Sequence, residues 1–432
     1  MHTPRKPLYL ALLLALVPAC DAKDVVEGKG DKAKDAAKSD GSAPAGSNDG
    51  AAEKADAAAP TLSVVQVAAG HSAACALMDN GTARCWGRNN LGEHGIEPSD
   101  IDAATPVAIS GVADATDIWM GGDSGSSGDM ACVRTKAGAI SCWGSRANKP
   151  KTDGKKWTNT AEEIEALKGA KDLALGGGTQ YAILADGSVT AWGSSAFNSI
   201  GDGDTSSSTK GLTKVPGVAG ATGLAAGQNH ACALLGDGSV TCWGYVTPKQ
   251  APKKIEGLSD VIALGAGSGN SDTCAVTKDH KVHCWGESQT PKEEAALSGS
   301  TMVRARNHKC ALGEKGEVRC WGGNNRGQAG IGEQGKSNGK RDPVVDLGTA
   351  VHVDVGVNFA CAALGEAGAK CWGWNNRGQL GNGELIDSTR PVLVSSLTAE
   401  TLPPAVDGAD KAQEADVDMD WSGLPAACTK PT

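Results

Sequence analysis

The dipeptide Trp-Gly recurs seven times in this chain of 432 residues, and its spacing limits the fold more than any other feature. The seven tryptophans are Trp86, Trp143, Trp192, Trp243, Trp285, Trp321 and Trp372. Successive copies lie 36 to 57 residues apart, a period typical of propellers and solenoids. The sequence therefore predicts seven repeated units rather than two or three unrelated domains.

Each unit begins with an apolar segment, such as VVQVAAG at 64–70 or VHVDVGV at 351–357. A second strand, a turn and the strand ending in Trp-Gly follow, and several units close on a segment such as TPVAIS at 105–110. The chain has 59 glycines but only 11 Trp, 3 Tyr and 2 Phe, which favours short strands and turns. We therefore expect an all-β, seven-bladed β-propeller of four-stranded blades at residues 61–402. The first and last units match the pattern best, which favours a closed ring over an open solenoid with polar caps.

Three longer stretches resemble a known repeat. They are AAGQNHACALLGDGSVTCWG at 225–244, ACAALGEAGAKCWG at 360–373 and NNRGQLGNG at 375–383. They look like repeats of the regulator-of-chromosome-condensation family, and the resemblance is strongest in units 1, 4, 6 and 7. The family has a seven-bladed propeller fold, and its members include a nuclear guanine-nucleotide exchange factor and a secreted bacterial β-lactamase inhibitor. The resemblance thus implies a binding platform rather than one particular activity.

The N-terminus has the pattern of an export signal. Two basic residues precede an apolar run at 8–19 that is too short to span a bilayer and suits a secretory signal peptide, expected at 1–19. The ending VPAC at 17–20 resembles a bacterial lipobox, which implies cleavage before Cys20 and lipid attachment to its thiol. The alternative is a plain signal peptide, cleaved nearby. If the lipobox interpretation holds, the protein is exported and lipid-anchored to a bacterial membrane, where it faces the periplasm or the cell surface.

Both ends outside the repeats are polar. Residues 20–60 contain two large apolar side chains, so we expect a disordered, lipidated stalk there. Residues 403–432 read as an irregular acidic tail that contains Cys428. Removal of residues 1–19 leaves 39 Lys and Arg against 50 Asp and Glu, a net charge of −11. This acidic balance argues against nucleic acid as a partner, and we expect a monomer.

Twelve of the 14 cysteines form six pairs, each separated by ten residues. The pairs are Cys75 with Cys85, Cys132 with Cys142, Cys232 with Cys242, Cys274 with Cys284, Cys310 with Cys320, and Cys361 with Cys371. Unit 3 lacks both members, with Tyr181 and Ala191 in their places. The absence of both cysteines from the same unit is expected if the two form a disulfide with each other. A hairpin turning at Asp237 would place its two cysteines opposite each other, at a Cα separation that a disulfide accepts. We therefore predict six disulfides, each within one blade, which fits an oxidising compartment.

No motif indicates catalysis or a cofactor. The chain has no nucleophile elbow, P-loop or HExxH sequence. A zinc site at HKVHC, 280–284, is disfavoured because Cys284 has a partner, and the DGD at 202–204 lacks the spaced acidic ligands of a calcium loop. His71, His230 and His308 are interpreted as turn residues. We therefore expect no cofactor, no metal and no enzyme activity.

The loops after Trp-Gly are the candidate binding site. Units 1, 6 and 7 carry full versions, RNNLGEHG (88–95), GNNRGQAG (323–330) and WNNRGQLG (374–381), whereas units 4 and 5 have short ones. In a closed ring these three units are neighbours, so their loops would form one arc. It would display Arg88, Asn89, Asn90, Asn325, Arg326, Trp374, Asn376 and Arg377. Its Asn and Gly residues could equally serve turn geometry alone.

Trp374 has no aromatic counterpart in the other two full loops, and a Trp beside arginines has the composition of an interface anchor. We therefore predict a non-catalytic protein-binding propeller with an unknown envelope partner. The alternative is a polysaccharide-binding or polysaccharide-acting envelope protein, in which Trp119, Trp157 and Trp374 would stack on sugars. Inhibition of a secreted enzyme such as a β-lactamase fits less well, because that inhibitor type uses loops rich in aromatic residues.

Overall fold

The computed structural model describes residues 62–99, 102–122, 128–145, 157–245, 251–267, 272–335, 339 and 341–397, with Trp157 described by its backbone only. All of them belong to one compact unit, Ala58–Thr432. The predicted signal peptide, stalk and acidic tail, with Cys20 and Cys428, lie outside the described residues. Within the described part of the chain, no helix is long and apolar enough to cross a bilayer.

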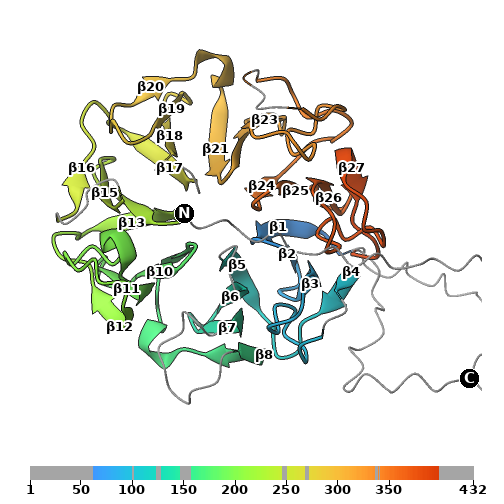
Figure 1. Ribbon diagram of the computed structural model, residues 1–432, viewed down its shortest axis with the longest axis horizontal. Helices are drawn as coiled ribbons and strands as arrows, with labels where there is room; N and C mark the ends of the chain where they lie inside the picture. Colours follow the sequence, from blue (N-terminus) through green and yellow to red (C-terminus); the bar gives the residue numbers. More distant parts are fainter. Residues whose placement is uncertain are drawn as a thin grey trace, which may run out of the picture. The chain divides into compact units, whose positions relative to one another are not determined.

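Seven antiparallel sheets surround a common axis, each built from one continuous stretch of chain (Figure 1). Blade 1 holds β1 (Val64–Ala69), β2 (Ala73–Met78), β3 (Ala83–Gly87) and β4 (Ala103–Ala108); blade 2 holds β5 (Ala115–Gly122), β6 (Asp129–Thr135), β7 (Ile140–Ser145) and β8 (Trp157–Glu163); blade 3 holds β9 (Asp172–Leu175), β10 (Thr179–Ile183), β11 (Val189–Ser194) and β12 (Thr209–Lys214). Blade 4 holds β13 (Ala221–Ala226), β14 (His230–Leu235), β15 (Val240–Gly244) and β16 (Lys253–Lys254); blade 5 holds β17 (Val261–Ala266), β18 (Thr273–Thr277), β19 (Val282–Trp285) and β20 (Lys292–Glu293). Blade 6 holds β21 (Ser300–Ala305), β22 (His308–Gly313) and β23 (Val318–Gly322), and blade 7 holds β24 (His352–Val355), β25 (Phe359–Ala363), β26 (Ala369–Gly373) and β27 (Ser388–Leu393). Three short 3-10 helices, η1 (Glu165–Leu167), η2 (Ala196–Asn198) and η3 (Ala295–Leu297), lie between strands.

This architecture confirms the predicted seven-bladed propeller, with one local difference. In blade 6 a single bridge between Arg319 and Pro343 stands where the other blades have a fourth strand.

The ring is closed between blades 7 and 1. The backbone N–H of Val64, at the start of β1, donates to the carbonyl of Gly365 at 3.0 Å. The indole Nε1 of Trp86 donates to the carbonyl of Gln379 at 2.8 Å. In Figure 1, β1 lies directly beside β24 and β25, with which it packs. The contacts of the two end units therefore support the closed ring.

Each repeated tryptophan fills the boundary between its own blade and the one before it. Trp243 packs edge to face against Tyr181 of blade 3, with ring centroids 5.7 Å apart. Four of the indoles also donate a hydrogen bond to the loop that follows Trp-Gly in the preceding blade: Trp86 to Gln379 O, Trp143 to Glu93 O, Trp243 to Ser199 O and Trp372 to Gln328 O, at 2.8 to 3.0 Å. The next residue must be glycine, because a Cβ atom at Gly87, where φ is +99°, would lie 2.5 Å from Ser72 O.

The cysteine pairs lie opposite each other on the second and third strands of their blades. Cys232 is the cross-strand partner of Cys242, and Leu234 is the partner of Val240, as the turn at Asp237 predicts. In blade 3, Tyr181 and Ala191 hold the same register, and the Tyr181 hydroxyl donates to Ser199 O at 2.7 Å.

All six predicted disulfides are formed, with Cα atoms 4.0 to 4.1 Å apart. Every predicted partner is the one observed: Cys75 is bonded to Cys85, Cys132 to Cys142, Cys232 to Cys242, Cys274 to Cys284, Cys310 to Cys320, and Cys361 to Cys371. The Cα separation is slightly shorter than the 4.5–5.5 Å expected for directly opposed residues of an antiparallel pair. Each bond therefore lies across one hairpin and links the second and third strands of its own blade.

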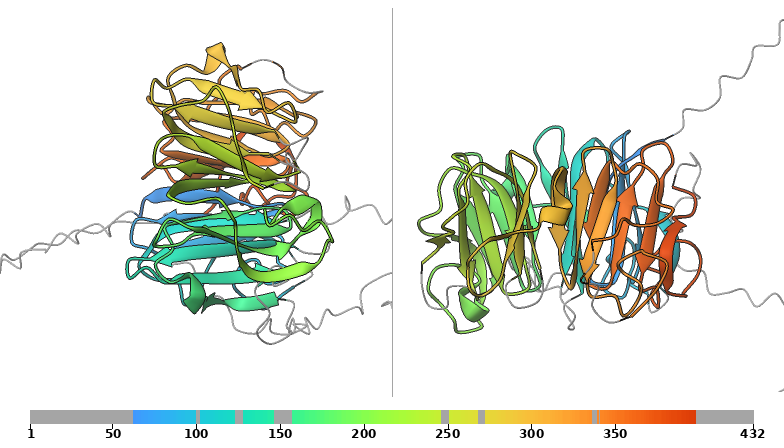
Figure 2. Two further views of the ribbon diagram at one scale, coloured as in Figure 1. Left: turned by 90° about the vertical axis from the view of Figure 1, so that its left-hand side faces the viewer. Right: turned by 90° about the horizontal axis from the view of Figure 1, so that it is seen from above.

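Strand order places two sets of loops on one face. Because the four strands of a blade alternate in direction, the loop between the first and second strands and the loop after Trp-Gly leave the sheet at the same end. We call the face with these loops the Trp-Gly face. The two side views in Figure 2 show the sheets standing side by side around the ring.

Candidate functional site

The loops after Trp-Gly are held by side chains that point into the turn. In blade 7, Asn375 Oδ1 accepts from the N–H of Leu380 at 2.9 Å, and its Nδ2 donates to Glu384 O at 2.9 Å. Gln379 Oε1 accepts from the N–H of Arg377 at 2.7 Å. Blade 6 repeats this pattern with Asn324, Ala329, Glu333, Gln328 and Arg326. The Asn and Gln of the motif are thus buried scaffold, as the turn-geometry reading requires.

Blade 1 uses the same scaffold with one substitution. Asn89 is buried, and its Oδ1 accepts from the N–H of His94 at 3.0 Å, so this member of the predicted display is part of the scaffold. Glu93 takes the place of Gln328 and Gln379, and its Oε2 accepts from the N–H of Leu91 at 2.7 Å. Glu93 is fully buried, and desolvation raises its pKa to about 7.

The remaining predicted residues are accessible to different degrees. Arg88, Asn90 and Trp374 are half-buried, whereas Asn325, Arg326, Asn376 and Arg377 are exposed. The exposed four occupy matching positions in blades 6 and 7, directly after the buried Asn of each loop. Blade 1 contributes less to this surface than the sequence suggests, because Leu91 stands where the other two loops have an arginine.

Trp374 contacts side chains of both neighbouring blades, from the loop after Trp-Gly in blade 6 and from the loop between the first and second strands of blade 1. The Cζ atom of Arg326, from blade 6, lies 5.6 Å from the ring centroid of Trp374 in blade 7, within the range of a cation–π contact. The other side of the contact comes from blade 1, where the ring of His71 meets Trp374 edge to face at 6.4 Å. Trp374 therefore lies at the meeting point of blades 6, 7 and 1.

Two ion pairs also link the loops of these neighbouring blades. Arg326 Nη1 lies 3.3 Å from Asp387 Oδ2 of blade 7, and Arg377 Nη1 lies 3.2 Å from Asp102 Oδ2 of blade 1. About half of each arginine side chain stays exposed, so screening by water and salt keeps these pairs weak. We call Asn325, Arg326, Trp374, Asn376, Arg377 and His71 the arginine arc.

Two apolar side chains beside the arc escaped the sequence analysis. Leu385 and Ile386 are 57% and 71% exposed, and they directly precede Asp387, the partner of Arg326. The available signal was a pair of large apolar residues inside the otherwise polar loop ELIDST. Single exposed apolar residues are common, but this pair stands next to a tryptophan and two arginines.

A second aromatic group lies on another part of the Trp-Gly face. Phe197, in the loop of blade 3, meets Tyr245 of blade 4 edge to face at 5.5 Å, and both are more than 40% exposed. Trp119, by contrast, is turned inward: its Nε1 donates to Asp172 at 3.2 Å and Arg134 lies over its ring. Trp119 is therefore poorly placed to stack on a sugar.

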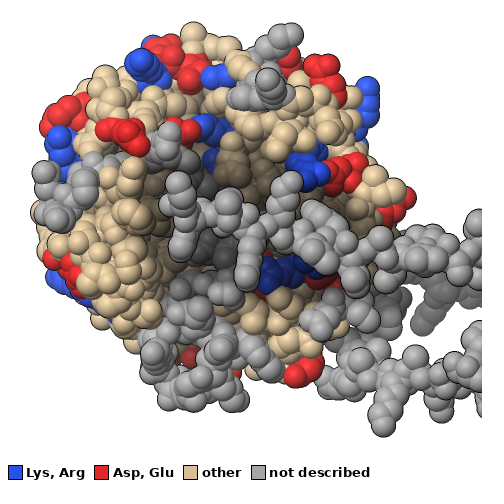
Figure 3. All heavy atoms as spheres, viewed as in Figure 1, with Lys and Arg blue, Asp and Glu red and all other residues tan. Residues whose placement is uncertain are grey.

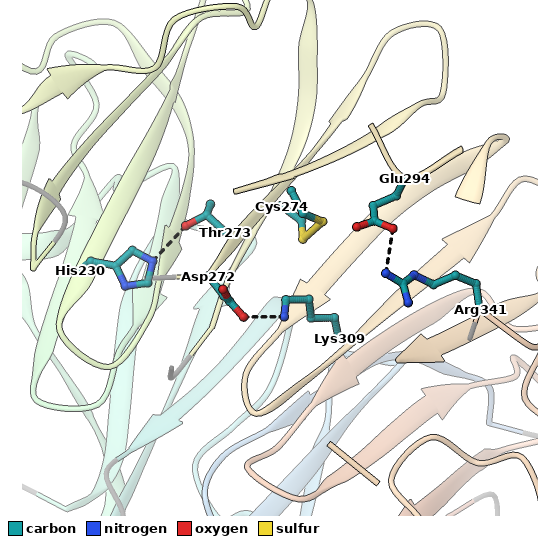
Figure 4. Close-up of a disulfide and its surroundings, with 8 residues drawn as sticks. His230, Asp272, Thr273, Cys274, Glu294, Lys309 and Arg341 are labelled. Carbon is teal, nitrogen blue, oxygen red and sulfur yellow. Dashed lines mark hydrogen bonds and ion pairs between the residues drawn. A yellow bond between two sulfur atoms is a disulfide. The ribbon is translucent and has the colours of Figure 1, made fainter. Parts of the chain in front are cut away.

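His230 and His308, interpreted from the sequence as turn residues, are instead the buried first residues of β14 and β22. Desolvation lowers the pKa of buried His230 to about 4 and that of buried His308 to about 3, so both are neutral. His230 contacts Thr273 Oγ1 of blade 5 at 3.0 Å, beside the disulfide of Cys274 and Cys284 (Figure 4). The same view shows two links from blade 5 to blade 6, Asp272 to Lys309 and Glu294 to Arg341, both at 2.7 Å.

The described residues carry charges of both signs on the surface. Acidic and basic side chains are interspersed around the rim in Figure 3, without a broad field of one sign. In the same described part of the chain, no three His, Cys, Asp or Glu side chains are grouped closely enough to hold a metal ion. Cys284 of the HKVHC segment is bonded to Cys274.

Comparison with known proteins agrees with this geometry. Sequence models of the Regulator of chromosome condensation (RCC1) repeat match residues 64–93, 221–245 and 306–328, and a second model of that repeat matches 371–407. These segments fall in units 1, 4, 6 and 7, where the repeat pattern of the sequence is strongest.

Two curated proteins and one solved structure are similar to this chain. The Ultraviolet-B receptor UVR8 of Arabidopsis thaliana is 24% identical over 377 residues, which cover 79% of this chain and 84% of the receptor. The E3 ubiquitin-protein ligase HERC2 of Homo sapiens is 28% identical over 187 residues, 42% of this chain but 4% of that ligase. The crystal structure of Prp20p from Saccharomyces cerevisiae has a TM-score of 0.61 and 18% identity, covering 78% of this chain and 88% of its own. The chain thus carries RCC1 repeats on a seven-bladed β-propeller.

Proposed function

We propose that this chain is a non-catalytic, protein-binding propeller, displayed in the bacterial cell envelope on a lipid-anchored stalk, and that the arginine arc is its contact surface. The lipid anchor and the export rest on the lipobox-like VPAC at 17–20 and on the paired cysteines. Protein binding is also supported by Prp20p, a propeller of the same fold described as binding Gsp1p and histones.

The observation that carries the proposal is the contact between Arg326 and Trp374. It joins two blades and leaves both side chains partly open to solvent, at a site where no core packing requires a tryptophan. Trp and Arg are the residues that most often dominate binding energy at protein interfaces. Leu385 and Ile386 add apolar surface next to them, and the partly exposed ion pairs of the two arginines can be exchanged for contacts with a partner.

The test is affinity capture from the native envelope with the full chain as bait. We compare the wild type with Trp374→Ala/Arg377→Ala and with a control, Phe197→Ala/Tyr245→Ala, which removes the exposed aromatic pair elsewhere on the same face. The proposal expects a stoichiometric protein partner that is lost with the first variant and retained with the control. Equal capture by all three chains would contradict the role of the arc.

A polysaccharide ligand is the second candidate, and the pair of Phe197 and Tyr245 is the observation that favours it. Two exposed rings on adjacent loops supply apolar faces of the kind on which sugars stack. If the control variant, rather than the arc variant, loses binding to an envelope glycan panel and no protein partner is recovered, this second function replaces the first.

A further inference from the structure

The channel at the centre of the propeller is lined by the seven inner strands, and their register aligns them residue by residue. In each blade, one inner residue pairs with the first cysteine position of the second strand: Ala68, Trp119, Ala174, Ala225, Gly265, Arg304 and Asp354. Two residues further on, at the end of the channel on the Trp-Gly face, the chain has Gly70, Gly121, Gly176, Gly227, Gly267, Arg306 and Gly356. Six blades thus carry glycine at this level and blade 6 alone carries arginine.

Close contact between neighbouring backbones explains several of the glycines. A Cβ atom at Gly121 would lie 1.9 Å from Leu175 O of the next blade, and one at Gly227 would lie 2.3 Å from Gly267 O. Such distances exclude any side chain without a shift of the backbone. Arg306 keeps the local hairpin, because its N–H donates to His308 O at 2.8 Å. Arginine is therefore not required by the turn, and its long side chain enters a level of the channel that the other blades leave bare.

The guanidinium group of Arg306 is poorly compensated. Its Nη1 lies 3.5 Å from Gly122 O of blade 2, across the ring, which is the long limit of a hydrogen bond. Among the described residues, no carboxylate lies within ion-pair distance of it, although the side chain is half-buried. A partly desolvated cation with no carboxylate in direct contact among these residues favours the binding of an anion.

A second guanidinium lies on the same side of the same strand. Arg304 precedes Arg306 by two residues, so both side chains point into the channel. Arg304 Nε lies 3.6 Å from Asp354 Oδ1, and its Nη2 lies 3.4 Å from His352 Nε2. Asp354 also accepts the N–H of Ala69 at 2.8 Å. Asp172 also lines the channel, and the charge of Arg304 acts on it. Two guanidinium groups therefore stand beside two buried carboxyl groups, and burial raises the pKa of both carboxyl groups.

The space beside these groups has the size of a small ligand. A cavity of about 290 Å³ follows the channel and is lined by Arg304, Arg306, His352, Asp354 and Trp119, among others. Figure 3 shows basic side chains, with acidic ones beside them, around the central hollow of the ring. Low-dielectric walls strengthen the attraction between these guanidinium groups and an anion.

We propose that the channel binds a small oxyanion, a phosphate or a carboxylate, between Arg306 and Arg304. The guanidinium fork matches both ligand types through paired N–H donors. The cavity volume lies near the lower end of the range for ligand pockets, so a compact anion fits and a nucleotide is too large. This site is separate from the arginine arc and does not depend on the protein-binding function.

The test is calorimetric titration of the full chain with inorganic phosphate and with succinate, at an ionic strength held constant with sodium chloride. Arg306→Gly gives blade 6 the residue of the other six blades, and Arg390→Ala removes an exposed arginine from the rim as a control. We expect saturable binding of at least one anion, weakened at least tenfold by Arg306→Gly and unchanged by Arg390→Ala. Thermal unfolding checks that both variants are folded.

Two outcomes overturn the site. One is the absence of saturable binding of either anion to the wild type. The other is equal affinity in the wild type and Arg306→Gly. If Arg306→Gly does not fold, Arg306→Met replaces it, because methionine keeps an unbranched chain and removes only the charge and the donors. Phosphate binding without succinate binding, or the reverse, supports the site and identifies which oxyanion the channel accepts.

Discussion

The indole Nε1 of Trp86 in blade 1 donates to the backbone carbonyl of Gln379 in blade 7 at 2.8 Å. This bond joins the first and last units of the propeller. Trp86 is fully buried, so loss of the bond would leave the carbonyl of Gln379 without this donor in a dry environment. The repeated Trp-Gly thus serves ring closure as well as packing.

Trp86→Phe is expected to destabilise the protein more than Trp192→Phe. Both tryptophans are fully buried and hold the same repeat position, but the Nε1 of Trp192 has no hydrogen-bond partner among the described residues. The two variants lose similar packing, and only Trp86→Phe breaks a bond between blades. We expect a difference of about 1–2 kcal/mol in the free energy of unfolding, measured by urea denaturation. Equal losses would show that the Trp86 bond contributes little to stability.

Glu93→Gln is expected to stabilise the fold at neutral pH. In blades 6 and 7 the corresponding glutamine donates from Nε2 to the neighbouring Asn, as Gln328 does to Asn325 at 3.0 Å. In blade 1, Glu93 Oε1 and Asn90 Oδ1 are both buried without a partner among the described residues. An amide at position 93 could supply the missing donor, and an ionised carboxylate could not.

The pH dependence of this effect follows from the pKa of Glu93. Burial raises it from 4.5 to about 7, with the nearby negative charge of Asp129 acting in the same direction and the hydrogen bond from Leu91 and the charge of Arg88 opposing it. A carboxyl group with a raised pKa contributes stability below pH 4.5 and loses it as the pH rises through 7. The advantage of Glu93→Gln should therefore be small at pH 4.5 and reach about 3 kcal/mol above pH 7. A difference that does not change with pH would contradict this assignment.

Asp129→Asn is expected to loosen the junction of blades 1 and 2. The carboxylate of Asp129, fully buried in blade 2, accepts three backbone N–H groups of blade 1, those of His71, Ser72 and Ala73, at 2.6 to 3.1 Å. An amide of the same shape places an NH₂ group against one or two of these donors. We expect a loss of about 2–3 kcal/mol in urea denaturation.

Asp272→Asn is the matched control for this prediction. Asp272 stands near the same point of blade 5, but its carboxylate forms a partly exposed ion pair with Lys309. Such pairs contribute about 0–1 kcal/mol, so the control should lose much less stability than Asp129→Asn. Similar losses in both variants would mean that the three N–H contacts of Asp129 are not important.

The repeat pattern and the cysteine spacing were sufficient to predict the fold and the disulfides, because both follow from local rules: a strand period, a turn and a fixed register. Asp129 and Arg306 could not be recognised in the same way. Asp129 acts on a loop 56 to 58 residues earlier in the chain, and nothing in its own segment marks that partner. Arg306 becomes exceptional only after the cross-strand register aligns it with six glycines.

In the candidate site, too, some features could be predicted from the sequence and others could not. Neighbouring loops in blades 6, 7 and 1 follow from the closed ring, so the position of the arc could be predicted. The sequence could not predict which Asn of each Asn-Asn pair is buried and which is more accessible, because this depends on which side chain accepts the backbone N–H groups of the turn. The contact of Trp374 with His71 also required the structure, since it joins the two ends of the repeat region.

The last prediction concerns the disulfides. Each one closes a loop of ten residues within a hairpin, so the chain-entropy model gives about 2–3 kcal/mol for each. Cys232→Ala/Cys242→Ala should lose this amount relative to the wild type in urea denaturation under non-reducing conditions, and the difference should vanish when both proteins are fully reduced before unfolding. Peptide mapping without reductant should find no free thiol at the twelve paired cysteines. Blade 3 shows that a blade can form without the bond, since Tyr181 and Ala191 keep the same register. The variant should therefore fold, and a variant that retains wild-type stability, or free thiols at these positions, would contradict the proposed contribution of the bonds.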